Sequence, residues 1–141
     1  MTRWTAAASL LLVAGVCLGQ MAPAAAPAWG ISGTVVGGSG RHTIHIALWD
    51  AAGFLRKPVR EVVIEPGHAR DFRFAVPEGW WALSAYEDVN GNGKLDMGTF
   101  GPKEPSGFWR PFHGWHQPRF EEVAVKIDRD TTGVEIRLSG H

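Results

Sequence analysis

Short segments in which apolar and polar residues alternate recur along this chain, and they constrain its fold more than any other feature. Within residues 42–49, for example, Ile44, Ile46 and Leu48 face one way and their neighbours face the other. A period of two is typical of a β-strand with one buried and one solvated face. The pattern appears in seven segments: 33–36, 42–49, 59–64, 71–76, 80–87, 120–127 and 132–138. Because no helical apolar stripe after residue 28 exceeds two turns, the sequence predicts an all-β domain.

The residues between these segments predict how the strands are connected. Glycine, proline, serine and acidic residues make up all of 37–40 and 77–79 and all but His68 of 65–68, and these residue types favour tight turns. About seven short strands joined by such turns are typical of a β-sandwich. One stretch, 89–119, has no clear strand pattern but is rich in phenylalanine and tryptophan, which argues against disorder. We expect it to be a long ordered loop over one end or edge of the sandwich.

The N-terminal residues have the layout of a secretory signal peptide. Arg3 precedes an apolar run over 6–18, which is too short to span a bilayer as a mature helix, and small residues follow. Cleavage after Ala26 would leave a single domain at 27–141, and Ala28 is a second possible cleavage position. The alternative is an N-terminal membrane anchor. We expect export to the periplasm or beyond, with no membrane anchor after cleavage.

Cleavage at either position would change the composition in an informative way. It would remove Cys17, the only cysteine, so the mature domain could form no disulfide and would not be a small disulfide-stapled module. It would also leave 13 of the 14 basic residues against 14 acidic ones, a net charge of −1. No basic stripe predicts nucleic-acid binding, and no overall charge excess predicts binding to a membrane surface.

Residues 88–96 have most of the ligand spacing of an EF-hand-type calcium loop. Side-chain oxygens occur at loop positions one, three, five and nine, and Gly93 at position six permits the sharp turn. Position twelve is Thr99, where such loops usually have a glutamate. The candidate ligands are Asp88, Asn90, Asn92, Asp96, the Lys94 carbonyl and, if the chain folds back, Glu104.

Two interpretations of this loop remain open. With only two charged residues among the loop ligands, Asp88 and Asp96, calcium affinity should be weak, with a dissociation constant of about 10⁻⁴ to 10⁻³ M. Magnesium fits less well because it requires stricter geometry. In the alternative, the segment is an Asx-rich turn whose side chains bind its own backbone, and Lys94 pairs with a carboxylate so that no cation is needed.

Four blocks in a fixed order give the chain a resemblance to a known family. They lie at 79–81, 88–96, 101–108 and 118–125, within the runs PEGWWALSAYEDVNGNGKLD, GTFGPKEPSGFW and PRFEEVAV. This sequence resembles the bacterial exported family known as domain of unknown function 2141. The chain departs from the pattern at Pro102, directly after Gly101, and at Trp81, where tyrosine would be commoner. The resemblance implies an immunoglobulin-like or transthyretin-like β-sandwich of the kind seen in carboxypeptidase regulatory domains, and it implies no activity.

The loop 89–119 also contains residues with other possible roles. Trp109, Phe112 and Trp115 could form a binding platform for a sugar or peptide. We favour a small apolar core that seals the sandwich, because an ordered long loop needs burial to offset its chain entropy. His113 and His116, with His42 or His45, could ligate a transition metal, but two imidazoles are an incomplete site.

Catalysis has little support in the sequence. No serine has a recognisable histidine and acid partner, and Asp88 and Asp96 are not placed across a cleft by any pattern. We therefore expect no enzyme but an exported binding or structural module of unknown ligand, with calcium as its only cofactor. The alternative is a carbohydrate- or peptide-binding domain that uses the loop aromatics, and a small hydrolase comes third. The expected partner is a protein, a peptide or a glycan.

Overall fold

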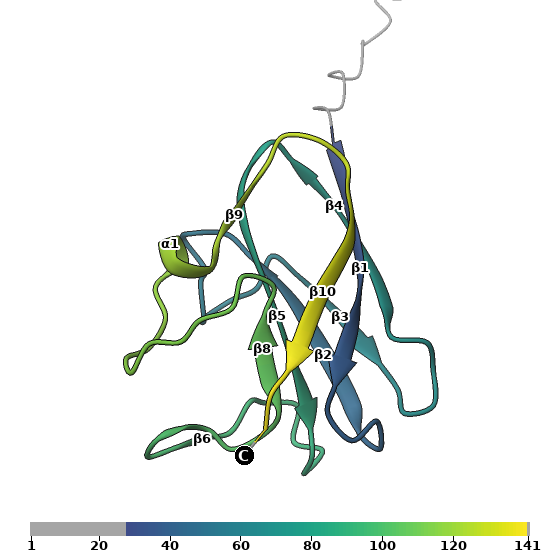
Figure 1. Ribbon diagram of the computed structural model, residues 1–141, viewed down its shortest axis with the longest axis vertical. Helices are drawn as coiled ribbons and strands as arrows, with labels where there is room; N and C mark the ends of the chain where they lie inside the picture. The colour runs from purple at the N-terminus through teal and green to yellow at the C-terminus, as the bar shows by residue number, and fades with distance from the viewer. Residues whose placement is uncertain (1–27, 141) are drawn as a thin grey trace, which may run out of the picture.

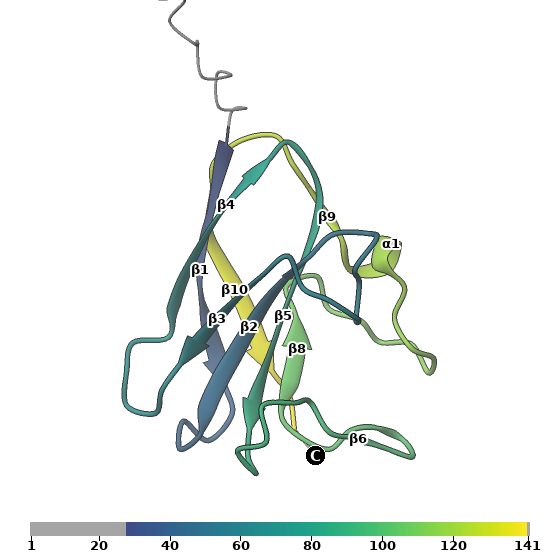
Figure 2. The ribbon, with the colours of Figure 1, turned by 180° about the vertical axis from the view of Figure 1, so that it is seen from behind.

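The computed structural model describes residues 28–140, in which two main β-sheets pack face to face and a separate two-stranded sheet lies outside them (Figures 1 and 2). The first sheet has three strands in the order β10–β1–β4. Their bounds are β1 Ala28–Gly37, β4 Asp71–Pro77 and β10 Thr131–Leu138. β1 pairs antiparallel with β4 and parallel with β10. The parallel pair joins the two ends of the domain within one sheet.

The second sheet is antiparallel and is built around β5 (Gly79–Asp88). Its order is β3–β2–β5–β8, and β9 pairs with the first residues of β5. The bounds of the other strands are β2 Thr43–Trp49, β3 Arg60–Ile64, β8 Ser106–Phe108 and β9 Val125–Ile127. The all-β prediction is confirmed.

The core lies between the sheets and consists of the inward residues of each alternating segment. Ile46, Leu83 and Ile136 have no exposed surface, and Phe72 and Phe74 pack with ring centroids 5.9 Å apart. The remaining buried apolar members of the cluster are Ile31, Val35, Ile44, Leu48, Ile64, Val76, Ala85, Ile127, Val134 and Leu138. Alternation therefore identified the buried faces of β2, β4, β5 and β10.

Two predictions about the later part of the chain are wrong. Residues 89–119 are not without strands: they contain β8 and a short hairpin of β6 (Met97–Gly98) and β7 (Gly101–Pro102). The expected strand at 120–127 begins instead with a helical turn, α1 (Phe120–Val123), and becomes β9 only at Val125. The physical reason is a pair of contacts that starts the helical turn: the Glu122 carboxylate accepts a hydrogen bond from the Arg119 N–H at 2.8 Å, and the Glu122 N–H donates to the Arg119 carbonyl at 3.0 Å.

Strand β8 closes one edge of the sandwich against the first sheet. Ser106 and Ser139 exchange backbone hydrogen bonds of 3.1 and 3.0 Å. Next to them, a Cβ atom on Gly107 would lie 2.1 Å from the Arg137 carbonyl oxygen. Only glycine allows β8 to approach β10 this closely. This contact therefore fixes where residues 89–119, called the insertion below, return to the sandwich.

The predicted signal peptide falls almost entirely in residues 1–27, outside the described residues, and export stays a prediction. Within residues 28–140, no helix is long and apolar enough to cross a membrane.

Candidate cation-binding loop

Asp88, the last residue of β5, organises the first half of the candidate loop. Its side chain is nearly buried, and its two oxygens accept hydrogen bonds from the backbone N–H groups of Asn92 at 3.2 Å and Gly93 at 2.7 Å. Gly91 and Gly93 have φ values of 71° and 73°, a backbone region that favours glycine. The loop thus turns tightly around a single carboxylate that binds the backbone of the loop itself, which is the arrangement expected of an Asx-rich turn.

Glu104, which follows β7, closes the second half of the loop. It is 5% exposed, and its carboxylate accepts hydrogen bonds from Val89 N at 3.0 Å and from Asp96 N at 3.1 Å. The Lys103 N–H donates to the Asp96 carbonyl at 2.8 Å, which keeps this return of the chain in place. The structure therefore brings Glu104 back to the loop, although both of its oxygens already bind backbone N–H groups.

Asp96 is surrounded by amide donors in this structure. The side-chain NH₂ groups of Asn90 and Asn92 both donate to its carboxylate, with Asn92 at 3.0 Å from each oxygen. The Oδ1 atoms of the two asparagines accept N–H bonds from Asn92 and Lys94 in short Asx turns. A cation would require both amides to turn and present Oδ1, which would exchange these hydrogen bonds for metal coordination.

Among the described residues, the loop is held by hydrogen bonds to Asp88, Asp96 and Glu104 and by the contact of His45 with Asp88. Among residues 28–140, no group of three or more histidine, cysteine, aspartate or glutamate side chains is close enough to hold a metal ion. Within the same residues, the ion pairs include none between a lysine or arginine and Asp88, Asp96 or Glu104. The pairing of Lys94 with a carboxylate, which would make a cation unnecessary, is therefore absent from this arrangement.

Negative charge gathers beside the loop on the outer face of β2 and β5. His45 stacks on Tyr86 with ring centroids 4.8 Å apart, and its Nδ1 lies 2.8 Å from Glu61 Oε1. Its Nε2 lies 3.5 Å from Asp88 Oδ2. Burial, followed by the charges of Glu61 and the loop carboxylates, raises the pKa of Tyr86 to about 12. The phenol therefore reports a locally negative environment.

A second buried carboxylate, Glu87, serves a different loop. It has no exposed surface, and it accepts a hydrogen bond from Ser39 N at 2.7 Å and a second from Ser39 Oγ. His42 Nδ1 lies 3.2 Å from the same carboxylate. Burial alone would raise the pKa of Glu87, but the hydrogen bonds outweigh it and lower the pKa to about 2.

Sequence reasoning missed this cluster of serine, histidine and glutamate. Its signal is a carboxylate at an inward position, in step with Leu83 and Ala85. The cluster lacks the geometry of a catalytic triad, because Ser39 Oγ and the Glu87 carboxylate both face the same nitrogen, Nδ1, of His42. It fastens the turn between β1 and β2 to the end of β5.

The loop aromatics do not act together. Trp109 packs against the core, Phe112 contacts the His116 ring edge to face at 5.2 Å, and Trp115 is fully exposed. The expectation of a small sealing core therefore holds for Trp109 and is wrong for Trp115. A different set of aromatic residues packs together at this side of the sandwich: Trp49, Phe54, Phe108 and Phe120.

The candidate metal-binding histidines are also separated. His42 contacts Glu87, His45 contacts Glu61, and His116 Nε2 lies 3.5 Å from Glu122. His113 is exposed. The described residues therefore contain no multi-histidine metal site.

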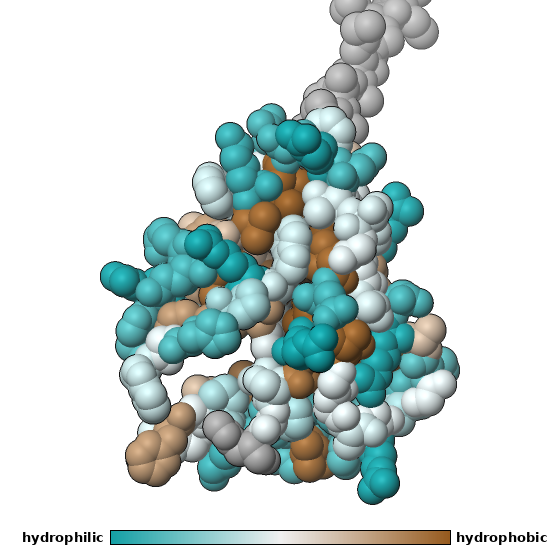
Figure 3. All heavy atoms as spheres, viewed as in Figure 1, coloured by the Kyte–Doolittle hydropathy of each residue, from teal (hydrophilic) through white to brown (hydrophobic). Residues whose placement is uncertain are grey.

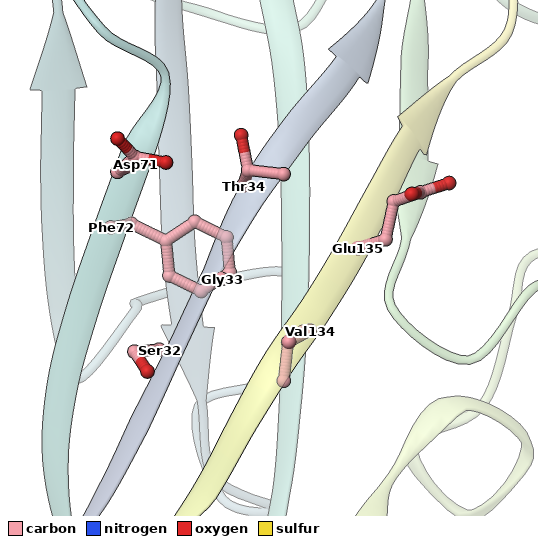
Figure 4. Close-up of a pocket in the computed structure, with 8 residues that line it drawn as sticks. Ser32, Gly33, Thr34, Asp71, Phe72, Val134 and Glu135 are labelled. Carbon is pink, nitrogen blue, oxygen red and sulfur yellow. The ribbon is translucent and has the colours of Figure 1, made fainter.

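A hollow on the outer face of the first sheet contains none of the predicted site residues. Figure 4 shows polar side chains of β1, β4 and β10 around it, among them Thr34, Asp71 and Glu135. These side chains project outward from three strands without converging on one point (Figure 4). Nothing in this hollow resembles a set of ligands or catalytic groups.

The fold and the site together define a small all-β domain with a carboxylate-rich loop at the end of its central strand. The chain belongs to a family described as an uncharacterized protein conserved in bacteria (DUF2141), whose model matches residues 39–135. The match includes the whole of the loop and its closing residue, Glu104. Searches of curated proteins and of solved structures gave no match.

Proposed function

We propose that this protein is an exported binding or structural β-sandwich module whose 88–96 loop is stabilised by a weakly bound calcium ion. The observation that supports this most is the pair of nearly buried carboxylates, Asp88 and Glu104, on either side of Asp96. Within the described residues they have backbone N–H groups and His45 as partners, and no lysine or arginine. Buried carboxylates are costly without a compensating charge, which a divalent cation would supply.

The donor set fits calcium better than other metals. All candidate groups are oxygens: two loop carboxylates, two asparagine amides and the Lys94 carbonyl, a set that suits a hard cation. Asp88 and Glu104 each accept two N–H bonds, so Asp88 would coordinate the cation through its remaining lone pairs. The role of Glu104 would be to orient the loop and to add negative charge nearby. The small ligand charge favours weak binding, with a dissociation constant of about 10⁻⁴ to 10⁻³ M.

Thermal unfolding in calcium tests the proposal. Calcium that binds only the folded state stabilises it by about 2.7 kcal/mol at 100 times the dissociation constant, which should raise the Tm of such a domain by about 10 °C. Chelator should reverse the rise, and magnesium at the same concentration should give less. Asp88→Ala should abolish the response, whereas Asp128→Ala, which removes an exposed carboxylate outside the loop, should keep it. A wild-type Tm that is unchanged up to about 10 mM calcium would refute the proposal that the loop binds calcium.

Export is the second part of this proposal, and its support is the N-terminal sequence. The intact mass of protein recovered from the periplasm should correspond to a chain that begins after Ala26 or Ala28. A recovered chain that still contains Met1 would contradict it.

The exposure of Trp115 favours a second candidate function, a carbohydrate- or peptide-binding domain. An exposed indole stacks readily on a sugar ring or a peptide side chain. A glycan array and a peptide library would test this, with Trp115→Ala as the variant that should lose binding.

A further inference from the structure

The 89–119 insertion exposes more large apolar surface than its length would suggest. Phe100 and Trp115 are fully exposed, and Met97 and Val89 are 62% and 47% exposed. The other exposed large apolar residues of the described chain are Val59, Val63 and Trp80, which lie on or beside the strands of the sandwich. Exposed apolar side chains gathered in one region usually mark a contact surface.

These side chains belong to two separate projections. Phe100 lies in the turn of the β6–β7 hairpin, and Trp115 lies in the segment between β8 and α1. The hairpin and that segment extend from the same side of the sandwich in both ribbon views (Figures 1 and 2). The space-filling view shows them as two arms separated by a gap, the lower one with an apolar tip (Figure 3).

The charge of the insertion differs from that of the rest of the domain. Residues 89–119 contain four basic and two acidic residues, a net charge of +2, while the remainder of 28–140 has nine basic and twelve acidic residues, a net charge of −3. The acidic pair, Asp96 and Glu104, is occupied by hydrogen bonds within the loop. The exposed charged side chains of the insertion are therefore all basic: Lys94, Lys103, Arg110 and Arg119. Within the described residues Arg119 pairs with Glu122 at 3.4 Å, whereas Lys94, Lys103 and Arg110 form no ion pair and are the groups available to an anionic partner.

We propose that the insertion is a peripheral docking surface for an anionic lipid membrane. Phe100 and Trp115 enter the headgroup region, where aromatic rings are favoured, and the basic residues contact lipid phosphates. The two exposed rings stand on separate arms and Trp109 packs against the core, so the loop aromatics form no shared flat platform. Two aromatic side chains on separate arms can each penetrate the headgroup region of a membrane without contacting one another. The docking surface goes beyond the proposed calcium-stabilised loop and does not depend on it.

Co-sedimentation with vesicles tests the docking surface. The protein used is the mature chain that begins after Ala26. It is mixed with vesicles of pure phosphatidylglycerol or pure phosphatidylcholine in the presence of chelator, so that the outcome is independent of calcium. We expect binding to phosphatidylglycerol, little binding to phosphatidylcholine, and a steep loss as salt screens the basic residues. Each of Phe100→Ala and Trp115→Ala should lower the partition coefficient by about tenfold.

Trp80→Ala is the matched control, because Trp80 is an exposed aromatic at the opposite end of β5 from the loop. It should bind vesicles as the wild type does. All three substitutions remove exposed side chains, so an unchanged Tm will show that each variant is folded. Absence of binding to phosphatidylglycerol, or equal binding by the Phe100→Ala/Trp115→Ala double variant, overturns the proposal. The proposal would also be overturned if the wild type does not bind vesicles but self-associates or binds a glycan, and the double variant does neither. That result would identify a second copy or the glycan as the partner of this surface.

Discussion

Replacing Glu104 with alanine tests whether the 89–119 insertion is held to the sandwich by a single buried carboxylate. Glu104 accepts hydrogen bonds from Val89 N at 3.0 Å and Asp96 N at 3.1 Å, and thereby links the start of the loop to its end. In Glu104→Ala both N–H groups lose a charged acceptor. The substitution should therefore loosen the whole return of the chain from Asp88 to β8.

The magnitude follows from the two bonds. A hydrogen bond to a charged group contributes about 1.5–3 kcal/mol, which gives about 3–6 kcal/mol for the pair. Val89 is half exposed, so water can replace the carboxylate at its N–H group, and we expect a loss of about 2–4 kcal/mol. With a urea m-value of about 2 kcal/mol/M, the unfolding midpoint should fall by about 1–2 M. Glu104→Gln keeps one acceptor but sets an NH₂ group against the other N–H, so it should cost about 1–3 kcal/mol.

Urea unfolding followed by tryptophan fluorescence, in chelator, measures these changes. Glu78→Ala is the matched control, because Glu78 is an exposed glutamate in the turn before β5, and its loss should change stability by less than about 0.5 kcal/mol. If Glu104→Ala unfolds at the same urea concentration as Glu78→Ala, the buried carboxylate does not hold the insertion, and the reasoning is refuted.

Three further predictions concern the core and the titratable groups. Leu83→Ala or Ile136→Ala should lower the free energy of unfolding by about 2–5 kcal/mol, since both side chains are fully buried. A loss below about 0.5 kcal/mol would contradict the placement of these side chains in the core. Acid should remove about 3 kcal/mol contributed by Glu87, because its folded pKa of about 2 lies below the ordinary 4.5. That contribution is complete above about pH 4.5 and disappears toward pH 2. The free energy of unfolding, measured in urea at several pH values across this range, should therefore change less with pH in Glu87→Gln than in the wild type. Tyr86 is the only tyrosine, so its absorbance titration should show one midpoint near pH 12. The free energy of unfolding should fall between about pH 10 and 12, because the phenol ionises at lower pH in the unfolded chain than in the folded one. A midpoint at about pH 10 would show that the phenol is solvated and would contradict the raised pKa.

The parts of the fold that were predictable from sequence are those with strong local periodicity. The inward positions of β2 and β4 follow directly from the alternation of Ile44, Ile46 and Leu48 and of Phe72, Phe74 and Val76. The return of Glu104 to the loop was also anticipated, because it is the nearest carboxylate downstream of a loop that lacks its usual glutamate.

The missed features depend on contacts between distant residues. β8 has three residues with Gly107 at its centre, and a glycine has no side chain to show an alternating pattern. The parallel pairing of β1 with β10 joins segments about a hundred residues apart, as in Gly33 with Val134, and local composition contains no information about it. α1 was obscured because its Val123 continues the apolar alternation of β9, although the glutamates at 121 and 122 favour a helix N-terminus.

Glu87 and Asp88 are consecutive residues, and their carboxylates serve different loops. Because neighbouring side chains of a strand point to opposite faces, one peptide unit connects the β1–β2 turn on the inner side with the 88–96 loop on the outer side. Insertion or deletion of one residue within β5 would exchange the two acids and leave both loops without their acceptor. In relatives of this chain, length variation should therefore be tolerated between β8 and α1 and strongly disfavoured within β5.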